Sequence, residues 1–143
     1  MDNSKTLFSI FLFLSMVFVS NALLGSYKNI TVKGTLLCGY KSVEGAKVEL
    51  YDHDRFDRDD LLATTKSNIV GNFEIFGKTR ELIRIEPYLW ITHSCVDNAF
   101  NKKCVVTGKY EIRNVQDYIG KTFNAGNIDL NKPLKKQSKK CKK

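Results

Sequence analysis

Apolar and polar residues alternate with a period of two through most of the chain after residue 29, and this pattern constrains the fold more than any other feature. In the first run Ile30, Val32 and Leu36 would share one face of a strand, while threonine and lysine side chains occupy the other face. Similar runs occur at residues 46–51, 62–65, 73–77, 83–92, 105–112 and 128–130. Short strands separated by turn residues are typical of an antiparallel β-sandwich, so we predict an all-β fold.

Two segments are less regular than the rest. Pro87 lies inside the run 83–92, and because proline cannot donate a hydrogen bond to a β-ladder, this strand is predicted to lie at an edge or to bend there. Residues 113–125 predict either a loop or one short helical turn around Val115 and Tyr118.

The N-terminal segment is typical of a secretory signal peptide. Lys5 lies in a short polar start, an uncharged apolar run covers residues 7–19, and small residues at Ser20 and Ala22 suit a peptidase that cuts after Ala22. Spanning a bilayer takes about 20 residues, so an uncleaved membrane anchor is the less favoured alternative. We therefore expect residues 1–22 to be removed and the remaining chain to be secreted, extracellular and without a transmembrane segment. In such a chain Asn29 of Asn-Ile-Thr is a glycosylation acceptor.

All four cysteines, Cys38, Cys95, Cys104 and Cys141, lie after the predicted signal peptide. An even number in an exported chain predicts two disulfides, and three pairings are possible. The short separation of Cys95 and Cys104 favours a bridge across a hairpin, which leaves Cys38 to pair with Cys141. A zinc site that includes His93 is the alternative, but export and the lack of a Cys-x-x-Cys motif argue against it. No metal ion or other cofactor is expected.

Positive charge is concentrated at the C-terminal end. The chain has a formal net charge of +8, and residues 132–143 contain seven lysines and no acidic residue, so residues 23–131 are nearly neutral. We predict a sandwich domain at 23–131 and a lysine-rich tail at 132–143. The tail suits an anionic partner such as acidic lipid head groups or sulfated glycans, or it serves only solubility. It lacks arginine and interleaved aromatics, so nucleic-acid binding is not expected. The candidate binding lysines are Lys135, Lys136, Lys139 and Lys140.

Tyr88 and Trp90 alternate with Leu89 and Ile91. If Leu89 and Ile91 face the core, both aromatic side chains point outward, where exposed aromatic pairs mark binding surfaces for proteins, lipids or apolar small molecules. An equally favoured alternative is that a loop or a dimer partner covers them. The oligomeric state is not predicted.

An aspartate-rich stretch begins at Asp52, and five aspartates within nine residues suggest a hard cation such as calcium. The EF-hand template fails, because Asp57 occupies its sixth position, where glycine is needed, and Ala63 its twelfth, where glutamate is needed. The stretch is instead predicted to be a polar loop whose aspartates cap turns and pair with Arg55 and Arg58.

Several motifs occur in an order that resembles the nematode transthyretin-like proteins. They are residues 32–38 (VKGTLLC), 48–52 (VELYD), 59–62 (DDLL), 71–77 (GNFEIFG), 86–95 (EPYLWITHSC) and 126–130 (GNIDL). The resemblance extends over residues 30–141. It implies a transthyretin-type (prealbumin-like) antiparallel Greek-key β-sandwich of about seven strands, secreted by a nematode. It does not imply hormone transport, because function resides in sites and not in folds.

The expected function is that of a secreted, non-enzymatic binding module that engages a lipid, an apolar small molecule, a receptor or a cell surface. One alternative is an enzyme that resembles 5-hydroxyisourate hydrolase, a relative of transthyretin that needs several histidines and a C-terminal Tyr-Arg-Gly-Ser. This chain has only His53 and His93 and lacks that tetrapeptide, and His93 is predicted to be structural, close to Cys95. The other alternative is a cationic membrane-active protein that depends on the lysine-rich tail.

Overall fold

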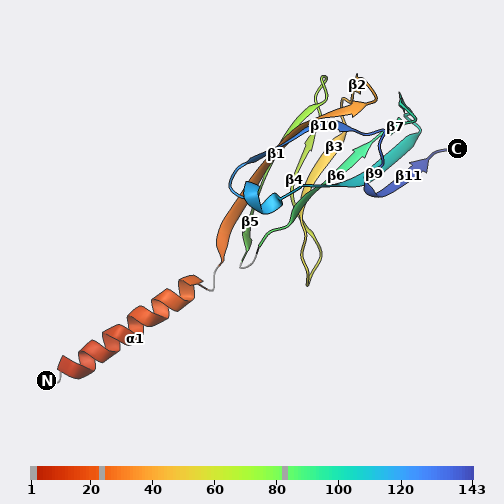
Figure 1. Ribbon diagram of the computed structural model, residues 1–143. Helices are drawn as coiled ribbons and strands as arrows, with labels where there is room; N and C mark the ends of the chain where they lie inside the picture. Colours follow the sequence, from red (N-terminus) through yellow and green to blue (C-terminus); the bar gives the residue numbers. More distant parts are fainter. Residues whose placement is uncertain (1–2, 23–24, 82–83) are drawn as a thin grey trace.

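Two β-sheets packed face to face make up the fold, and the computed structural model describes residues 3–22, 25–81 and 84–143 (Figure 1). The strands of the first sheet are β1 (Ser26–Cys38), β2 (Lys41–Ser42), β5 (Asn72–Glu81) and β10 (Thr122–Asp129). The long strand β1 pairs antiparallel with β5 and β2 along one side and parallel with β10 along the other.

The second sheet carries Tyr88, Trp90 and the lysines of the tail. Its strands are β3 (Lys47–Asp52), β4 (Asp60–Lys66), β6 (Pro87–His93), β9 (Cys104–Glu111) and β11 (Lys135–Cys141). They run in the order β11-β9-β6-β3-β4, and every neighbouring pair is antiparallel. A small hairpin of β7 (Cys95–Val96) and β8 (Ala99–Phe100) joins β6 to β9. The predicted all-β sandwich is confirmed.

The core lies between the two sheets and follows the predicted alternation. Ile30, Val32 and Leu36 of β1 face Val48 and Leu50 of β3 across it, and all five side chains are fully buried. Burial of one such aliphatic side chain contributes about 1.5–3 kcal/mol. The second sheet adds Leu89 and Ile91, and the first adds Phe73 and Ile75. The period of two therefore predicted the correct inward face of each of these strands.

Pro87 is the first residue of β6, and this corrects the prediction of an edge or bent strand. β6 pairs with β3 on one side and with β9 on the other, so it is central. Residues 84–86 precede it without strand structure. A proline is tolerated at the first position of a central strand, because the ladder there does not require its amide. Between β9 and β10 the predicted helical turn is present as a 3-10 turn, η1 (Val115–Tyr118).

The lysine-rich tail does not stand apart from the sandwich, because residues 135–141 form the edge strand β11 beside β9 (Figure 1). Leu134 packs against the core just before this strand. Gly108 makes that possible: a Cβ atom at position 108 would lie 2.5 Å from Leu134 Cβ. The strand was not predicted, because lysine and polar residues along it leave no apolar face to reveal a period of two.

Two disulfides are present, as predicted, but their pairing corrects the predicted connectivity. Cys38 is bonded to Cys95, which links the end of β1 in the first sheet to the start of β7, just after β6 of the second sheet. Cys104 of β9 is bonded to Cys141, the residue opposite it on β11. The predicted hairpin bridge fails because Cys95 is opposite Phe100 in the β7–β8 hairpin, so Cys104 already belongs to the next strand. Closing loops of this size stabilises a protein by about 4 kcal/mol each in the chain-entropy account.

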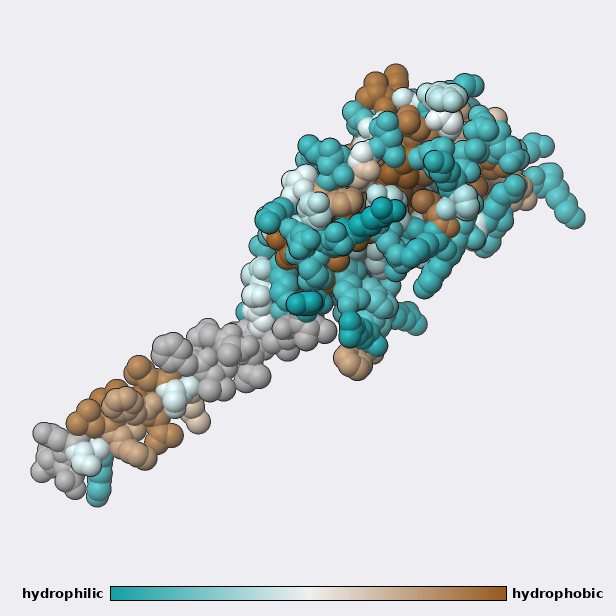
Figure 2. All heavy atoms as spheres, viewed as in Figure 1, coloured by the Kyte–Doolittle hydropathy of each residue, from teal (hydrophilic) through white to brown (hydrophobic). Residues whose placement is uncertain are grey.

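Helix α1 (Asn3–Ala22) is drawn apart from the sheets in Figure 1, and Figure 2 shows apolar residues along it. Phe8 and Phe11 are each 71% exposed, so the fold does not cover them. Among the described residues, no helix is both long enough and apolar enough to cross a membrane.

Replacement of Gly108 by alanine should displace β11, because the new methyl group would occupy the position of Leu134. We expect a loss of about 1–3 kcal/mol in the free energy of unfolding, measured with urea, and faster amide exchange in β11. The double variant Gly108→Ala/Leu134→Gly removes the opposing Cβ atom and should recover part of the loss. Slow exchange in β11 of Gly108→Ala would contradict this account of how the tail docks.

Candidate functional site

An aromatic cluster lies on the outer face of the five-stranded sheet. Tyr51 of β3 is opposite Tyr88 of β6, and their rings stack with centroids 5.8 Å apart. Trp90, two residues further along β6, meets the Tyr88 ring edge-on at 6.3 Å. Because Leu89 and Ile91 are in the core, the predicted outward direction of Tyr88 and Trp90 is correct.

Tyr88 is nevertheless covered, so exposure, one of the two equally favoured alternatives, does not hold for this residue. Only 5% of the residue is exposed, whereas Trp90 is half-buried. The ammonium group of Lys109 lies 3.8 Å from the centre of the Tyr88 ring, and the Tyr88 hydroxyl donates a 2.6 Å hydrogen bond to Asp59 Oδ2. Burial and this hydrogen bond raise the pKa of Tyr88, so the hydroxyl remains a donor. The alternative of a covering loop is therefore the correct one.

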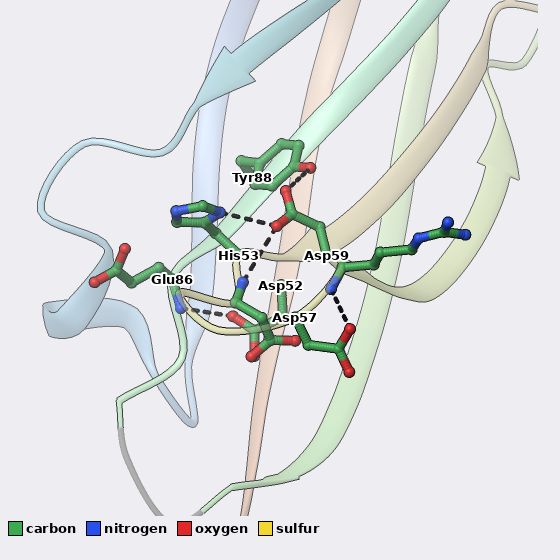
Figure 3. Close-up of polar contacts among 8 residues, drawn as sticks. Asp52, His53, Asp57, Asp59, Glu86 and Tyr88 are labelled. Atoms are coloured by element: carbon green, nitrogen blue, oxygen red, sulfur yellow. Dashed lines mark hydrogen bonds and ion pairs between the residues drawn. The ribbon is translucent and has the colours of Figure 1, made fainter.

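That loop connects β3 to β4, and Asp59 holds it together (Figure 3). Asp59 Oδ1 accepts hydrogen bonds from His53 Nδ1 at 2.9 Å and from the amide of Asp54 at 3.2 Å. Burial alone would raise the pKa of Asp59, but the hydrogen bonds from Tyr88 and His53 outweigh it and lower that pKa. The aspartate-rich stretch is thus a hydrogen-bonded loop, and the Asp59 carboxylate joins it to Tyr88.

The predicted pairing of the aspartates with arginines is wrong for Arg55. Its guanidinium Nη2 lies 2.8 Å from Glu86 Oε1, so Arg55 ties the loop to the segment before β6. Asp57 Oδ1 accepts a hydrogen bond from the backbone amide of Arg58, and not from its guanidinium group.

Asp52 is the buried carboxylate of this region. It is 2% exposed, and its Oδ1 accepts a 2.7 Å hydrogen bond from the amide of Glu86 (Figure 3). Oxygen atoms of Asp52, Asp54 and Glu81 lie within 4.8 Å of one another. Burial raises the pKa of Asp52 to about 6, against the effect of the hydrogen bond from Glu86, and repulsion from Asp54 and Glu81 adds to the rise. Protonation of Asp52 would relieve this repulsion without a cation.

One row of outward side chains joins the aromatic cluster to the tail lysines. Trp90 of β6 is opposite Lys109 of β9, and Lys109 is opposite Lys135 of β11. Lys135 also forms an ion pair with Glu111, which lowers the pKa of that carboxylate. We call Trp90, Lys109 and Lys135 the basic-aromatic row. Lys109 was not among the predicted residues, because only the strand register shows that it lies between the other two.

The other predicted lysines lie along β11 at increasing distance from the aromatic cluster. Lys136 has a positive φ of 48° at an irregularity of the β9–β11 register. Lys139 is opposite Val106 and Lys140 is opposite Val105, close to the Cys104–Cys141 bridge. All three are exposed. The structure thus brings Lys135 to the aromatic cluster and places the other lysines on the same sheet edge.

A hollow of about 690 Å³ lies at the Tyr88 end of this face. Pro87, Tyr88 and Ile112 line it with buried side chains, and η1 contributes Val115 and Gln116. These residues come from separate segments of the chain, so no local pattern in the sequence could have indicated the hollow.

The remaining candidate residues lie elsewhere. His93 is buried at the end of β6, where its Nδ1 accepts a 3.0 Å hydrogen bond from the amide of Cys95, so it lies beside that cysteine as predicted. Burial lowers the pKa of His93, which keeps the ring neutral. Asn29 is half-buried in β1 opposite Lys78, and its glycosylation stays a prediction.

Replacement of Asp52 by asparagine should stabilise the protein near neutral pH. The folded-state pKa of about 6 lies above the ordinary value of 3.8, so the folded protein loses stability as the pH rises through this interval. Asparagine keeps an oxygen for the Glu86 amide and removes the charge. We expect a gain of about 1–3 kcal/mol at about pH 8 and none at about pH 4, measured by urea unfolding.

Asp57→Asn is the matched control, because Asp57 is exposed, and it should change the free energy of unfolding by less than about 0.5 kcal/mol at either pH. A loss of stability in Asp52→Asn at about pH 8 would contradict the prediction and would indicate that a cation neutralises Asp52, Asp54 and Glu81.

Comparison with known proteins identifies the family. The family model named TTR-52, described as the transthyretin-like family, matches residues 33–113. Transthyretin-like protein 16 of Caenorhabditis elegans is 38% identical over 114 residues, which cover 80% of this chain and 83% of that protein. Transthyretin-like protein 5 of the same nematode is 40% identical over 116 residues, covering 80% and 81%. A solved 9R-lipoxygenase from Cyanothece is 19% identical with a TM-score of 0.44, over 72% of this chain and 16% of that one. The fold and the identities over most of the chain show that this protein belongs to the transthyretin-like family.

Proposed function

We propose that this protein is a secreted, non-enzymatic binding module that acts outside the cell and engages a lipid, a receptor or a cell surface through the outer face of its five-stranded sheet. The observation that carries the proposal is the basic-aromatic row, because Trp90, Lys109 and Lys135 come from three neighbouring strands and lie side by side. A rigid sheet presents these side chains at a smaller entropic cost than a flexible tail would.

Export is supported by three features of the chain. The large apolar side chains that the structure describes in α1, from Leu7 to Met16, are all exposed, as expected of a segment that is removed or inserted in a membrane during export. All four cysteines are in disulfides, which persist in oxidising compartments. The apolar run 7–19 is preceded by Lys5 and followed by small residues.

A non-enzymatic role is supported by the positions of the histidines. His53 follows Asp52, which is opposite Pro87 at the start of β6, whereas His93 is the last residue of β6. Seven strand residues span roughly 20 Å at about 3.3 Å per residue, so the two rings lie too far apart to act on one substrate. The disulfides also leave no cysteine thiol as a nucleophile among the described residues.

The arrangement of the tail favours adhesion over membrane disruption. β11 has the sequence KKQSKKC, with exposed side chains throughout and no large apolar residue that could enter the acyl region of a bilayer. Such a strand can bind an anionic surface through its lysines, each of which contributes about 1 kcal/mol close to the surface.

Export should be visible at the N-terminus of the protein recovered from medium. Expression of the full chain in eukaryotic cells that secrete proteins is expected to yield a product that begins at Leu23, measured by N-terminal sequencing or intact mass. Removal of residues 2–22 should leave the protein inside the cell. A secreted or membrane-bound product that keeps residues 7–19 would contradict cleavage after Ala22.

Three tail lysines should dominate binding to an anionic surface. In Lys135→Gln/Lys136→Gln/Lys140→Gln, we expect binding to vesicles that contain phosphatidylglycerol to weaken roughly tenfold to hundredfold, measured by flotation at low salt. Substitution is preferable to deletion of residues 132–143, because deletion would remove β11 and leave Cys104 unpaired.

The matched control replaces three exposed lysines in β1, in β2 and directly before β10 of the four-stranded sheet: Lys33→Gln/Lys41→Gln/Lys121→Gln. It has the same net charge as the β11 variant and should retain most of the binding. Equal weakening by both triple variants would show that net charge alone is responsible, and the proposed face would then be wrong.

A further inference from the structure

We infer that the hollow beside Tyr88 binds a small organic anion that has an apolar body and one anionic head group. This inference rests on the proposed binding function and deepens it by naming a class of ligand. The hollow measures about 690 Å³, within the range of about 300–1,000 Å³ that is typical of small-molecule sites. It lies between the β3–β4 loop, the start of β6, the end of β9 and η1.

The floor of the hollow is apolar, and the two polar side chains beside it donate hydrogen bonds to other parts of the protein. Pro87, Tyr88 and Ile112 are buried there. The Tyr88 hydroxyl donates to Asp59, and the Gln116 amide donates to the carbonyl of Ile85 at 2.7 Å. A sugar or another polar ligand would lose hydrogen bonds to water at this floor without replacement, whereas an apolar body would not.

Phe56 marks the mouth of the hollow. The residue is 96% exposed, so its ring packs against nothing in the fold although it lines the hollow. A large aromatic side chain held in water beside an apolar floor offers a second apolar surface to a ligand. Its loop is tied down on both sides, by Asp59 to Tyr88 and by Arg55 to Glu86.

The charges around the hollow favour an anion. Glu86 is paired with Arg55 and Glu111 with Lys135, so both glutamates that line the hollow have a cationic partner. Arg84 and Lys109 also line it, and neither is in an ion pair with a carboxylate within the part of the chain that the structure describes, although the charge of Lys109 helps to lower the pKa of Glu111. Two cations beside an apolar floor attract a carboxylate or a sulfonate, and Arg84 can bind one with two parallel hydrogen bonds.

A matched pair of fluorescent probes tests this inference on the secreted, oxidised protein. 8-Anilinonaphthalene-1-sulfonate has an apolar body and one anionic group, and N-phenyl-1-naphthylamine has nearly the same body without the charge. We expect saturable binding of the sulfonate at one site, about tenfold tighter than binding of the uncharged probe at low salt. Oleate, a natural carboxylate of the same class, should displace it.

Substitutions should separate the head-group contacts from the apolar contacts. Arg84→Gln/Lys109→Gln should abolish the tenfold preference for the sulfonate and leave the uncharged probe within twofold. Phe56→Ala should weaken both probes about threefold to tenfold without a change in melting temperature, because Phe56 is exposed. Arg84→Gln alone should remove part of the preference and guards against a structural effect of Lys109, which lies on the Tyr88 ring.

The controls distinguish this site from the tail. Lys121→Gln, and the triple variant Lys136→Gln/Lys139→Gln/Lys140→Gln, should leave binding of the sulfonate within twofold. If the protein binds the sulfonate but not the vesicles, only the proposed binding surface is refuted. If it binds the vesicles but not the sulfonate, only the proposed ligand site in the hollow is refuted. No saturable binding, or the same affinity for the sulfonate in Arg84→Gln/Lys109→Gln as in the unaltered protein, would overturn the inference.

Discussion

The packing of β1 against β3 and β6 across the core is the constraint on which the rest of the molecule depends. Ile30, Val32 and Leu36 of β1 belong to one buried cluster with the inward residues of β3 and β6. Gly77 lets the sheets approach, because a Cβ atom there would lie 2.5 Å from Leu50 Cδ2. The Cys38–Cys95 bridge then closes one end of the same pair of sheets. With both sheets held in this way, the outer face of β6 becomes a rigid platform.

Two further segments determine which side chains lie on that platform: the β3–β4 loop and the edge strand β11. Asp59 accepts three hydrogen bonds and draws the β3–β4 loop over Tyr88, which turns an exposed aromatic into the floor of a hollow. Leu134 and the Cys104–Cys141 bridge draw the lysine-rich tail against β9. The candidate functions of the molecule, adhesion through lysines and capture of an organic anion, each depend on one of these attachments and both depend on the same sheet.

The parts of the structure that the sequence predicted are those that apolar alternation encodes directly. The inward faces of β1, β3, β5 and β6 follow from residues such as Val32, Leu50 and Ile91, whose burial needs no knowledge of neighbours. β11 was not predicted because all its side chains are exposed, so its sequence has no alternation of apolar and polar residues. The disulfide pairing was mispredicted because the β7–β8 hairpin intervenes between Cys95 and Cys104. The cover over Tyr88 and the position of Lys109 depend on loop closure and strand register, which no local pattern reports.

The bridge between Cys104 and Cys141 has a consequence for the order in which the molecule can be assembled during synthesis. Cys38 and Cys95 leave the ribosome before Cys104, whereas Cys141 follows Cys104 by 37 residues. If Cys38 and Cys95 are oxidised early, Cys95, the cysteine nearest to Cys104 in the sequence, is no longer available to bond with Cys104. Until Cys141 is synthesised, the edge of β9 has no partner strand on that side and Cys104 has no bonding partner, so this thiol is open to mixed disulfides in an oxidising compartment.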